Sequence, residues 1–181
     1  LKRLTIGAYG LTSLHKDFAN LKNLEYLDLS NFNTANVNNM GSMFANCESL
    51  TRLDLSSFRT PNLTQMIYMF DGCRSLTELD VSGFDTRNVV DMGYLFRDCD
   101  SLTELDLSGN PLTALNAKLL PSGLEKLVLD DCEALERIEL DGRTALEVVL
   151  GDLSALTYLS LSGYGAYDLD LSGCPALTDL Y

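Results

Sequence analysis

A unit of 26 residues repeats in the middle of this chain and constrains its fold more than any other feature. Leu27, Leu53, Leu79 and Leu105 open the stretches LDLS, LDLS, LDVS and LDLS at that constant spacing. The L-x-x-L-x-L pattern puts leucines on one side of a short extended segment and polar residues on the other. Such a segment buries its apolar side only by stacking against the next copy. The sequence therefore predicts a solenoid with a parallel sheet.

The second half of each long unit changes its apolar period and predicts a short helix on the convex side. Apolar residues recur there at positions i, i+3 and i+7, which line one face of a helix. These residues are Val37/Met40/Phe44, Leu63/Met66/Phe70 and Val89/Met92/Phe96. A threonine stands at the N-cap position before each segment, at Thr34, Thr60 and Thr86. Each long unit is therefore expected to be a strand followed by a helix.

The repeats run through the whole chain and predict a single leucine-rich-repeat domain, residues 1–181. Residues 1–23 form one short coil, 24–101 form three strand–helix repeats, and 102–181 form coils of 21 or 22 residues. Coils of that length have no room for a helix, so an extended segment is expected on their convex side. The predicted fold class is an α/β repeat solenoid whose parallel sheet lies on the concave face.

The long unit resembles the repeat of BspA-like bacterial surface proteins. The resemblance lies in LDLSSF, T-x-N-V/L, M-x-x-M-F and C-x-S-L, which recur in register. The shorter coils, with ALTYLSLSG and LDLSGCPALTDLY, resemble 21-residue leucine-rich repeats of the same kind of protein. The resemblance implies a secreted, cell-surface or extracellular bacterial protein whose repeats serve adhesion or recognition, for example of a host extracellular or matrix protein. It implies no catalytic residues.

Charge and hydropathy argue against two classes of partner. Asp and Glu outnumber Lys and Arg by 26 to 13, for a formal net charge of −13. This charge repels nucleic-acid phosphates and anionic lipid headgroups. No apolar run approaches the roughly 20 residues that a membrane-spanning helix needs. We therefore expect neither nucleic-acid binding nor membrane insertion of this segment.

The sequence contains no motif that indicates catalysis or a cofactor. His15 is the single histidine, and no serine or cysteine nucleophile is tied to it by a motif. Phosphate-binding and dinucleotide-binding glycine motifs are absent. The cysteines lie three residues before a repeat-opening leucine, without the close pairs of a zinc site: Cys47, Cys73, Cys99, Cys132 and Cys174. We expect buried free thiols, although disulfides between adjacent coils stay open on distance alone. No enzymatic activity and no cofactor are expected.

The residues between and after the leucines should face outward on the concave sheet and form the candidate partner-binding surface. They are Tyr26, Asp28, Arg52, Asp54, Glu78, Asp80, Glu104, Asp106, Lys126, Val128 and Val149. Four of them form a column of aspartates whose mutual repulsion must be offset. Serine hydroxyls, water and Arg52 are one explanation, and Ca²⁺ near Asp54 and Asp80 is another, although a flat row offers few converging oxygens. Val128 and Val149 interrupt the column, which indicates either an apolar spot rimmed by charge or valines that a loop or a neighbouring side chain covers.

These features favour a non-enzymatic protein-binding solenoid that uses its concave strand face. A structural spacer or stalk that projects another domain is one alternative. Carbohydrate binding is the other, and the absence of tryptophan disfavours it. Leu1, Leu180 and Tyr181 leave apolar ends, which predicts either flanking sequence or end-to-end self-association.

Overall fold

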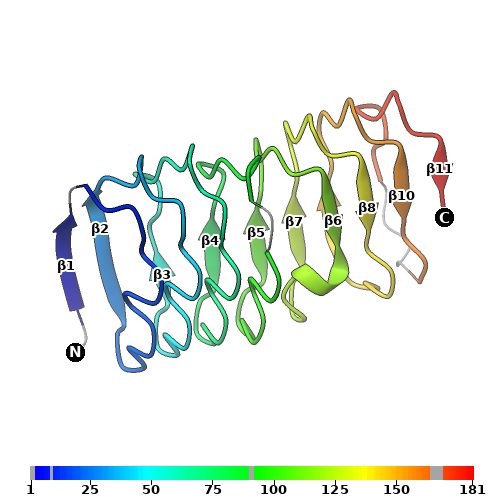
Figure 1. The fold of residues 1–181 in the computed structure, drawn as a ribbon. Helices are drawn as coiled ribbons and strands as arrows, with labels where there is room; N and C mark the ends of the chain where they lie inside the picture. Colours follow the sequence, from blue (N-terminus) through cyan, green and yellow to red (C-terminus); the bar gives the residue numbers. More distant parts are fainter. Residues whose placement is uncertain (1–2, 9, 90–91, 164–168) are drawn as a thin grey trace.

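The coils of this chain stack into a rod with the two chain ends at opposite ends (Figure 1). The computed structural model describes residues 3–8, 10–89, 92–163 and 169–181. Buried apolar side chains form one continuous core that runs from Leu14 to Cys174. The structure is therefore the parallel β-solenoid that the leucine spacing predicts.

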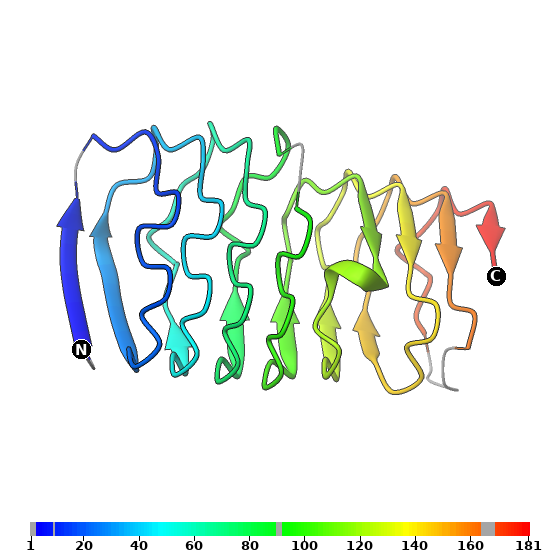
Figure 2. The ribbon, with the colours of Figure 1, turned by 60° about the horizontal axis from the view of Figure 1, so that its bottom comes forward.

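The strands lie on two sides of the rod, and Figure 2 shows these two layers. We call one side the strand face, which corresponds to the predicted concave face. It carries β1 (Arg3–Ala8), β2 (Tyr26–Phe32), β3 (Arg52–Leu53), β4 (Glu78–Asp80), β5 (Glu104–Asp106), β7 (Lys126–Val128) and β9 (Glu147–Val149). The other side carries β6 (Ala114–Asn116), β8 (Arg137–Glu139), β10 (Tyr158–Ser160) and β11 (Asp179–Leu180).

Strand pairing explains the shorter coils. β5 pairs with β7 and β7 with β9, whereas β6 pairs with β8 and β8 with β10. Successive leucine segments beyond residue 101 therefore fall alternately on the two sides of the rod. Extended segments were predicted opposite the strand face here, and the structure has strands at those places.

The helices predicted on the convex side of the three middle coils are wrong. Among the described residues the one helical element is the 3₁₀ turn η1 (Ala117–Leu119), and none of them forms a helix long and apolar enough to cross a membrane. Residues 15–20, 41–46, 67–72 and 93–98 are runs of consecutive turns instead, which we call the turn series. Val37, Met40 and Phe44 are fully buried. The apolar spacing thus located core residues but not the backbone conformation.

Hydrogen bonds between coils explain why the turn series is not helical. Alternate N–H groups of one coil donate to the next coil at 2.7–2.9 Å: Met40 to Gln65, Ser42 to Ile67, Phe44 to Met69 and Asn46 to Asp71. The N–H groups between them close turns inside the coil, as from Met43 to the Met40 carbonyl at 3.1 Å. An α-helix bonds all these groups within its own segment. Stacking diverts half of them, and the left-handed backbone of Ser42 and Asn46, at φ 55° and 59°, interrupts a helix as well.

The threonines predicted as helix N-caps tie neighbouring coils together. Thr34 Oγ1 accepts a hydrogen bond from the Arg59 N–H at 2.9 Å and donates one to the Arg59 carbonyl at 2.8 Å. Thr60 does the same with Asp85, at 2.7 and 3.4 Å. Thr86, the third in the series, lies where the coils shorten. Its buried hydroxyl has no partner among the residues that the structure describes.

Valine substitutions at Thr60 and Thr86 should therefore have different effects. Thr60→Val leaves the N–H and carbonyl of Asp85 without their partner, and we expect a loss of about 1–3 kcal/mol in the free energy of unfolding. Thr86→Val removes a buried hydroxyl that lacks a partner, so stability should stay unchanged or rise. Urea unfolding monitored by circular dichroism measures both. Equal losses for the two variants would contradict the bridging role of these hydroxyls.

The five cysteines are buried free thiols, as predicted. Four donate a hydrogen bond to a carbonyl of the preceding coil at 3.1–3.2 Å: Cys47 to Phe18, Cys73 to Phe44, Cys99 to Phe70 and Cys132 to Leu107. Burial raises the pKa of Cys47 and of Cys132 to about 11. These thiols are therefore protonated at neutral pH, whereas nucleophilic attack and metal binding need the thiolate.

Candidate functional site

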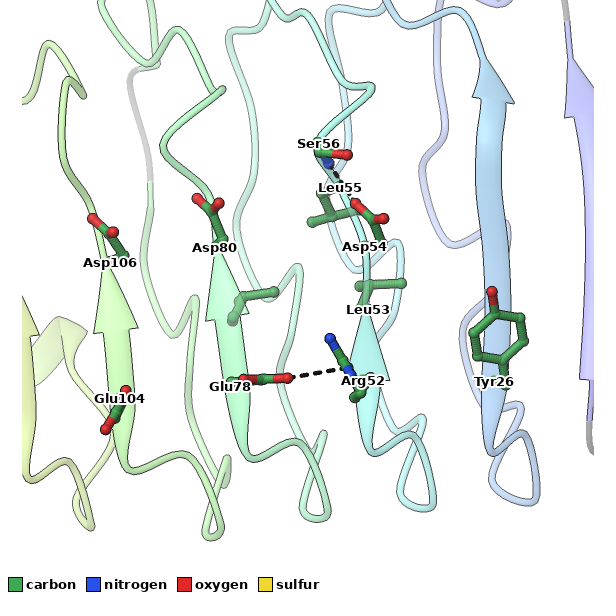
Figure 3. Close-up of a pocket in the computed structure, with 11 residues that line it drawn as sticks. Tyr26, Arg52, Leu53, Asp54, Leu55, Ser56, Glu78, Asp80, Glu104 and Asp106 are labelled. Carbon is green, nitrogen blue, oxygen red and sulfur yellow. Dashed lines mark hydrogen bonds and ion pairs between the residues drawn. The ribbon is translucent and has the colours of Figure 1, made fainter.

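The outward side chains of the strand face form two rows that cross the strands. In the first row Tyr26 pairs with Arg52, and Glu78 pairs with Glu104, which pairs with Lys126. The second row, two residues further along each strand, holds Asp28, Asp54, Asp80, Asp106, Val128 and Val149. Figure 3 shows both rows over β3, β4 and β5. The structure thus brings the predicted binding residues together on one surface.

A hollow of about 670 Å³ lies over β2–β5 on the strand face. Its outward lining consists of Tyr26, Arg52, Asp54, Ser56, Glu78, Asp80, Glu104 and Asp106. Five of these side chains are carboxylates, and Arg52 is the one basic residue in the lining. The Nε atom of Arg52 lies 3.0 Å from Oε1 of Glu78, and both side chains are largely exposed. This ion pair adds little stability, and the other four carboxylates of the hollow form no ion pair with Arg52.

Each aspartate of the column accepts a hydrogen bond from the serine two residues further on. The N–H groups of Ser30, Ser56, Ser82 and Ser108 donate to Oδ1 of Asp28, Asp54, Asp80 and Asp106 at 2.8–3.0 Å. Hydrogen bonds from Ser56, and to a smaller extent the charge of Arg52, hold the pKa of Asp54 below its usual range. Local hydrogen bonds to serine therefore offset part of the repulsion in the column.

A calcium site at Asp54 and Asp80 gains no support from this arrangement. Within the described ranges, no three or more His, Cys, Asp or Glu side chains are grouped so that they could hold a metal ion. Oδ1 of each aspartate is engaged with its serine. The column is thus a row of separately hydrogen-bonded carboxylates, and converging oxygens are what a calcium ion needs.

Apolar side chains replace the aspartates on β7 and β9. Val149 is 38% exposed and Val128 is half-buried. A second hollow of about 700 Å³ lies beside Val149, and its lining includes Glu147, Asp152 and Asp170. An apolar spot with carboxylates around it therefore lies next to the acidic hollow, where the sequence predicted it.

The sequence did not reveal the role of Arg143, whose side chain ties its own coil to an earlier turn by hydrogen bonds. Its guanidinium donates to the carbonyls of Pro121 at 2.6 Å, Leu120 at 2.9 Å and Ala117 at 3.0 Å. Burial lowers the pKa of Arg143. The carbonyl groups come from a turn more than 20 residues earlier, so no local motif could reveal this contact.

Nine chains of solved structure match this protein. One is described as "Functional domain of InlJ from Listeria monocytogenes includes a cysteine ladder". It is 19% identical with a TM-score of 0.28, and the alignment covers 100% of this chain and 58% of that chain. This protein thus spans little more than half the length of that structure, and no residue's role carries over at this identity. No curated protein matches the chain.

A family model matches residues 12–112, which include the three long coils. The family is described as "Mycoplasma protein of unknown function, DUF285". This description does not name the BspA-like proteins, so that resemblance stays a prediction. Because the match covers more than half of the 181 residues, the chain belongs to the DUF285 family.

Proposed function

We propose that this chain is a non-enzymatic protein-binding module that holds a basic segment of its partner on the strand face. The observation that carries the proposal is the hollow over β2–β5, where five carboxylates lie around a single guanidinium (Figure 3). The sheet holds these groups about 4.8 Å apart from strand to strand. Lysine and arginine side chains of a partner would meet an acidic surface that is already arranged. The net charge of −13 also attracts a basic partner from a distance.

The apolar spot extends this surface along the rod. Val128 and Val149 lie in the same row as Asp80 and Asp106, one and two strands further on. Apolar contacts surrounded by charge supply much of the affinity of protein interfaces. We therefore propose that the partner segment crosses the strands, with basic side chains over β3–β5 and an apolar side chain over β7 and β9.

We also propose that the module works on the outer surface of a bacterial cell, where an extracellular protein is its partner. This part rests on the resemblance of the long unit to the BspA-like repeat. Protease treatment of intact cells that express the full-length protein, followed by immunoblotting, tests it. Degradation of the protein while a cytosolic marker stays intact is the expected result. Protection of the protein until the cells are lysed would contradict a surface location.

Removing the charge of three aspartates should weaken the binding of a basic peptide. The variant Asp54→Asn/Asp80→Asn/Asp106→Asn keeps an Oδ1 acceptor for each serine N–H, so the local turns are retained. The probe is a fluorescent lysine-rich peptide, and its anisotropy is measured during titration at low salt. We expect affinity to fall about tenfold or more, because exposed charge pairs contribute up to ~1 kcal/mol each. Affinity of the unmodified protein should also fall as salt is added.

A matched control removes the same charge from another place. Asp131→Asn/Glu133→Gln/Glu136→Gln changes three exposed carboxylates outside the hollow and gives the same net charge. This control should bind the peptide nearly as well as the unmodified protein. If both triple variants lose affinity equally, the overall charge attracts the peptide and the hollow is not the binding site.

A further inference from the structure

One position of the turn series carries tyrosine in two successive coils. In order along the rod the position holds Lys16, Ser42, Tyr68 and Tyr94. All four residues have a left-handed backbone, with φ between 55° and 65°. This conformation is costly for a bulky residue. A choice of residue that conflicts with local backbone preference is expected where the side chain serves a function.

The rings of Tyr68 and Tyr94 form a parallel stack along the rod. Their centroids lie 5.1 Å apart and their planes differ by 3°. The guanidinium carbon of Arg97 lies 5.3 Å from the Tyr68 centroid and 5.2 Å from that of Tyr94. Nε and Nη2 of Arg97 each donate to a carboxylate oxygen of Asp71 at 2.7 Å, and Asp71 is only 8% exposed. This anchored guanidinium holds both rings in place.

The stack ends at Tyr68, because the preceding coil has the small Ser42 at the same position. A hollow of about 330 Å³ lies there. Its lining includes Tyr68, Ser42, Asn46, Asn20, Lys16 and Asp71. Tyr68 lines this hollow and Tyr94 does not. The ring face of Tyr68 that turns away from Tyr94 is therefore available for another ring.

We propose that this hollow binds a sugar ring of a glycan, which continues the stack on the free face of Tyr68. A pyranose offers an apolar C–H face to the electron-rich face of an aromatic ring, and it carries hydroxyl groups around its edge. The hollow supplies both kinds of contact. Beside the ring of Tyr68 it has the hydroxyl of Ser42, the amides of Asn20 and Asn46, and the ammonium of Lys16. The volume lies at the small end of the range of small-ligand sites.

The polar rim distinguishes a sugar from an aromatic side chain of a partner protein. Nδ2 of Asn46 donates to Oδ1 of Asn20 at 3.1 Å, which leaves the other polar atoms of the two amides and the Ser42 hydroxyl facing the hollow. A tyrosine or phenylalanine ring in this place would cover these atoms without bonding to most of them, which costs free energy. The charges select further among sugars. Arg97 also lines the hollow, and its charge is balanced by its partner Asp71. Lys16 therefore gives the lining a net positive charge. A chain of net charge −13 repels highly anionic glycans. Neutral pyranose sugars are therefore the ligand class. This site lies outside the strand face and is independent of the proposed protein binding.

Saturation-transfer NMR with neutral trisaccharides of glucose, galactose and N-acetylglucosamine tests the proposal. At millimolar sugar, at least one of them should receive saturation from the protein, most strongly at the protons of one ring face. Tyr68→Ala should weaken its binding about fivefold or more, because the stacking contact is lost. Ser42→Tyr should abolish binding, because a third ring in register fills the hollow. Tyr26→Ala is the matched control, since it removes a tyrosine of the strand face and should leave sugar binding unchanged.

Circular dichroism shows whether each variant folds. If Tyr68→Ala does not fold, Ser42→Tyr decides the outcome, because it adds a side chain to the surface without deleting the stack. The proposal is wrong if no trisaccharide receives saturation, or if sugar binding survives in Ser42→Tyr. The binding of p-cresol, which resembles a tyrosine side chain, is measured in the same way as the last part of the test. Binding of p-cresol that Ser42→Tyr abolishes, with no binding of any sugar, would mean that the hollow accepts an aromatic side chain, and the glycan proposal would be overturned.

Discussion

Replacement of Phe70 by alanine is expected to lower the free energy of unfolding by about 3–5 kcal/mol. Phe70 is fully buried, and its ring lies between those of Phe44 and Phe96 at centroid distances of 5.6 and 5.7 Å. Alanine leaves a cavity in the middle of this stack. The backbone around it is bonded to the coils on both sides, as from the Phe70 N–H to the Leu95 carbonyl at 3.0 Å. The coils therefore cannot close the cavity without breaking these bonds.

The loss should also change how the rod unfolds. A solenoid coil contacts only its neighbours, so a weak coil uncouples the parts before and after it. Urea unfolding of the variant should show a lower midpoint and a broader transition than that of the unmodified protein. Phe70→Leu is the control, since it retains most of the volume and should cost less than about 2 kcal/mol. Equal losses for leucine and alanine would show that the space filled by the ring is not what stabilises the coil.

The protein is expected to lose stability steeply above pH 9. Burial raises the pKa of Cys47 and Cys132 to about 11 and of Cys99 to about 12, and it raises the pKa of Cys73 well above its usual value near 9. Between pH 9 and pH 11 the unfolded chain releases these protons while the folded chain keeps them. The stability that the thiols contribute is thus complete below pH 9 and declines as pH rises towards their folded pKa values. At pH 10 each buried thiol lowers the free energy of unfolding by about 1.4 kcal/mol relative to its value below pH 9. The loss from four such thiols is comparable with the total stability of a typical domain.

Urea unfolding at several pH values between 8 and 10.5 measures this dependence. Cys73→Ala is the informative variant, because it removes one titrating thiol. The substitution has its own cost at every pH, so the slope of stability against pH is what must be compared. That slope should be shallower by about 1.4 kcal/mol per pH unit in the variant. Identical slopes would mean that Cys73 titrates alike in the folded and unfolded chains.

The leucine spacing was sufficient to predict the sheet, its register and most of the core. Leu27, Leu53 and Leu79 recur at a constant distance, and stacking of equal coils places them in a single column. Period-two alternation then fixes the outward rows, which is why Arg52 and Glu78 could be predicted as neighbours on the strand face. These features depend only on the repeat and on burial.

The conformation of the turn series could not be predicted in this way. Met40 and Phe44 have helical spacing and are buried, but their N–H groups bond to the next coil and not to their own. Periodicity reports which side chains are inside, and it carries no information on where the backbone hydrogen bonds go. The role of Thr60 was misassigned for the same reason, because its partner Asp85 lies one coil away.

The candidate site shows the same limit. The aspartate column was predicted from alternation, and serine was one of two explanations for its stability. The turn formed by Asp54 and Ser56 became visible only with the distances between their atoms. The hollow beside Tyr68 depends on a contrast between coils, Ser42 against Tyr68 at one repeat position. A residue-by-residue alignment of the long units would have revealed that contrast, whereas the search for a helical face concealed it.

The change of coil length near residue 101 affects the two sides of the rod differently. On the strand face β4, β5, β7 and β9 pair in register across that point. The opposite side changes there from the turn series to the sheet of β6, β8, β10 and β11. The difference in coil length is thus absorbed on one side only, and the spacing of the outward rows on the strand face is preserved. Coils of different length can therefore be joined in one rod without a break in the surface that the strand face presents.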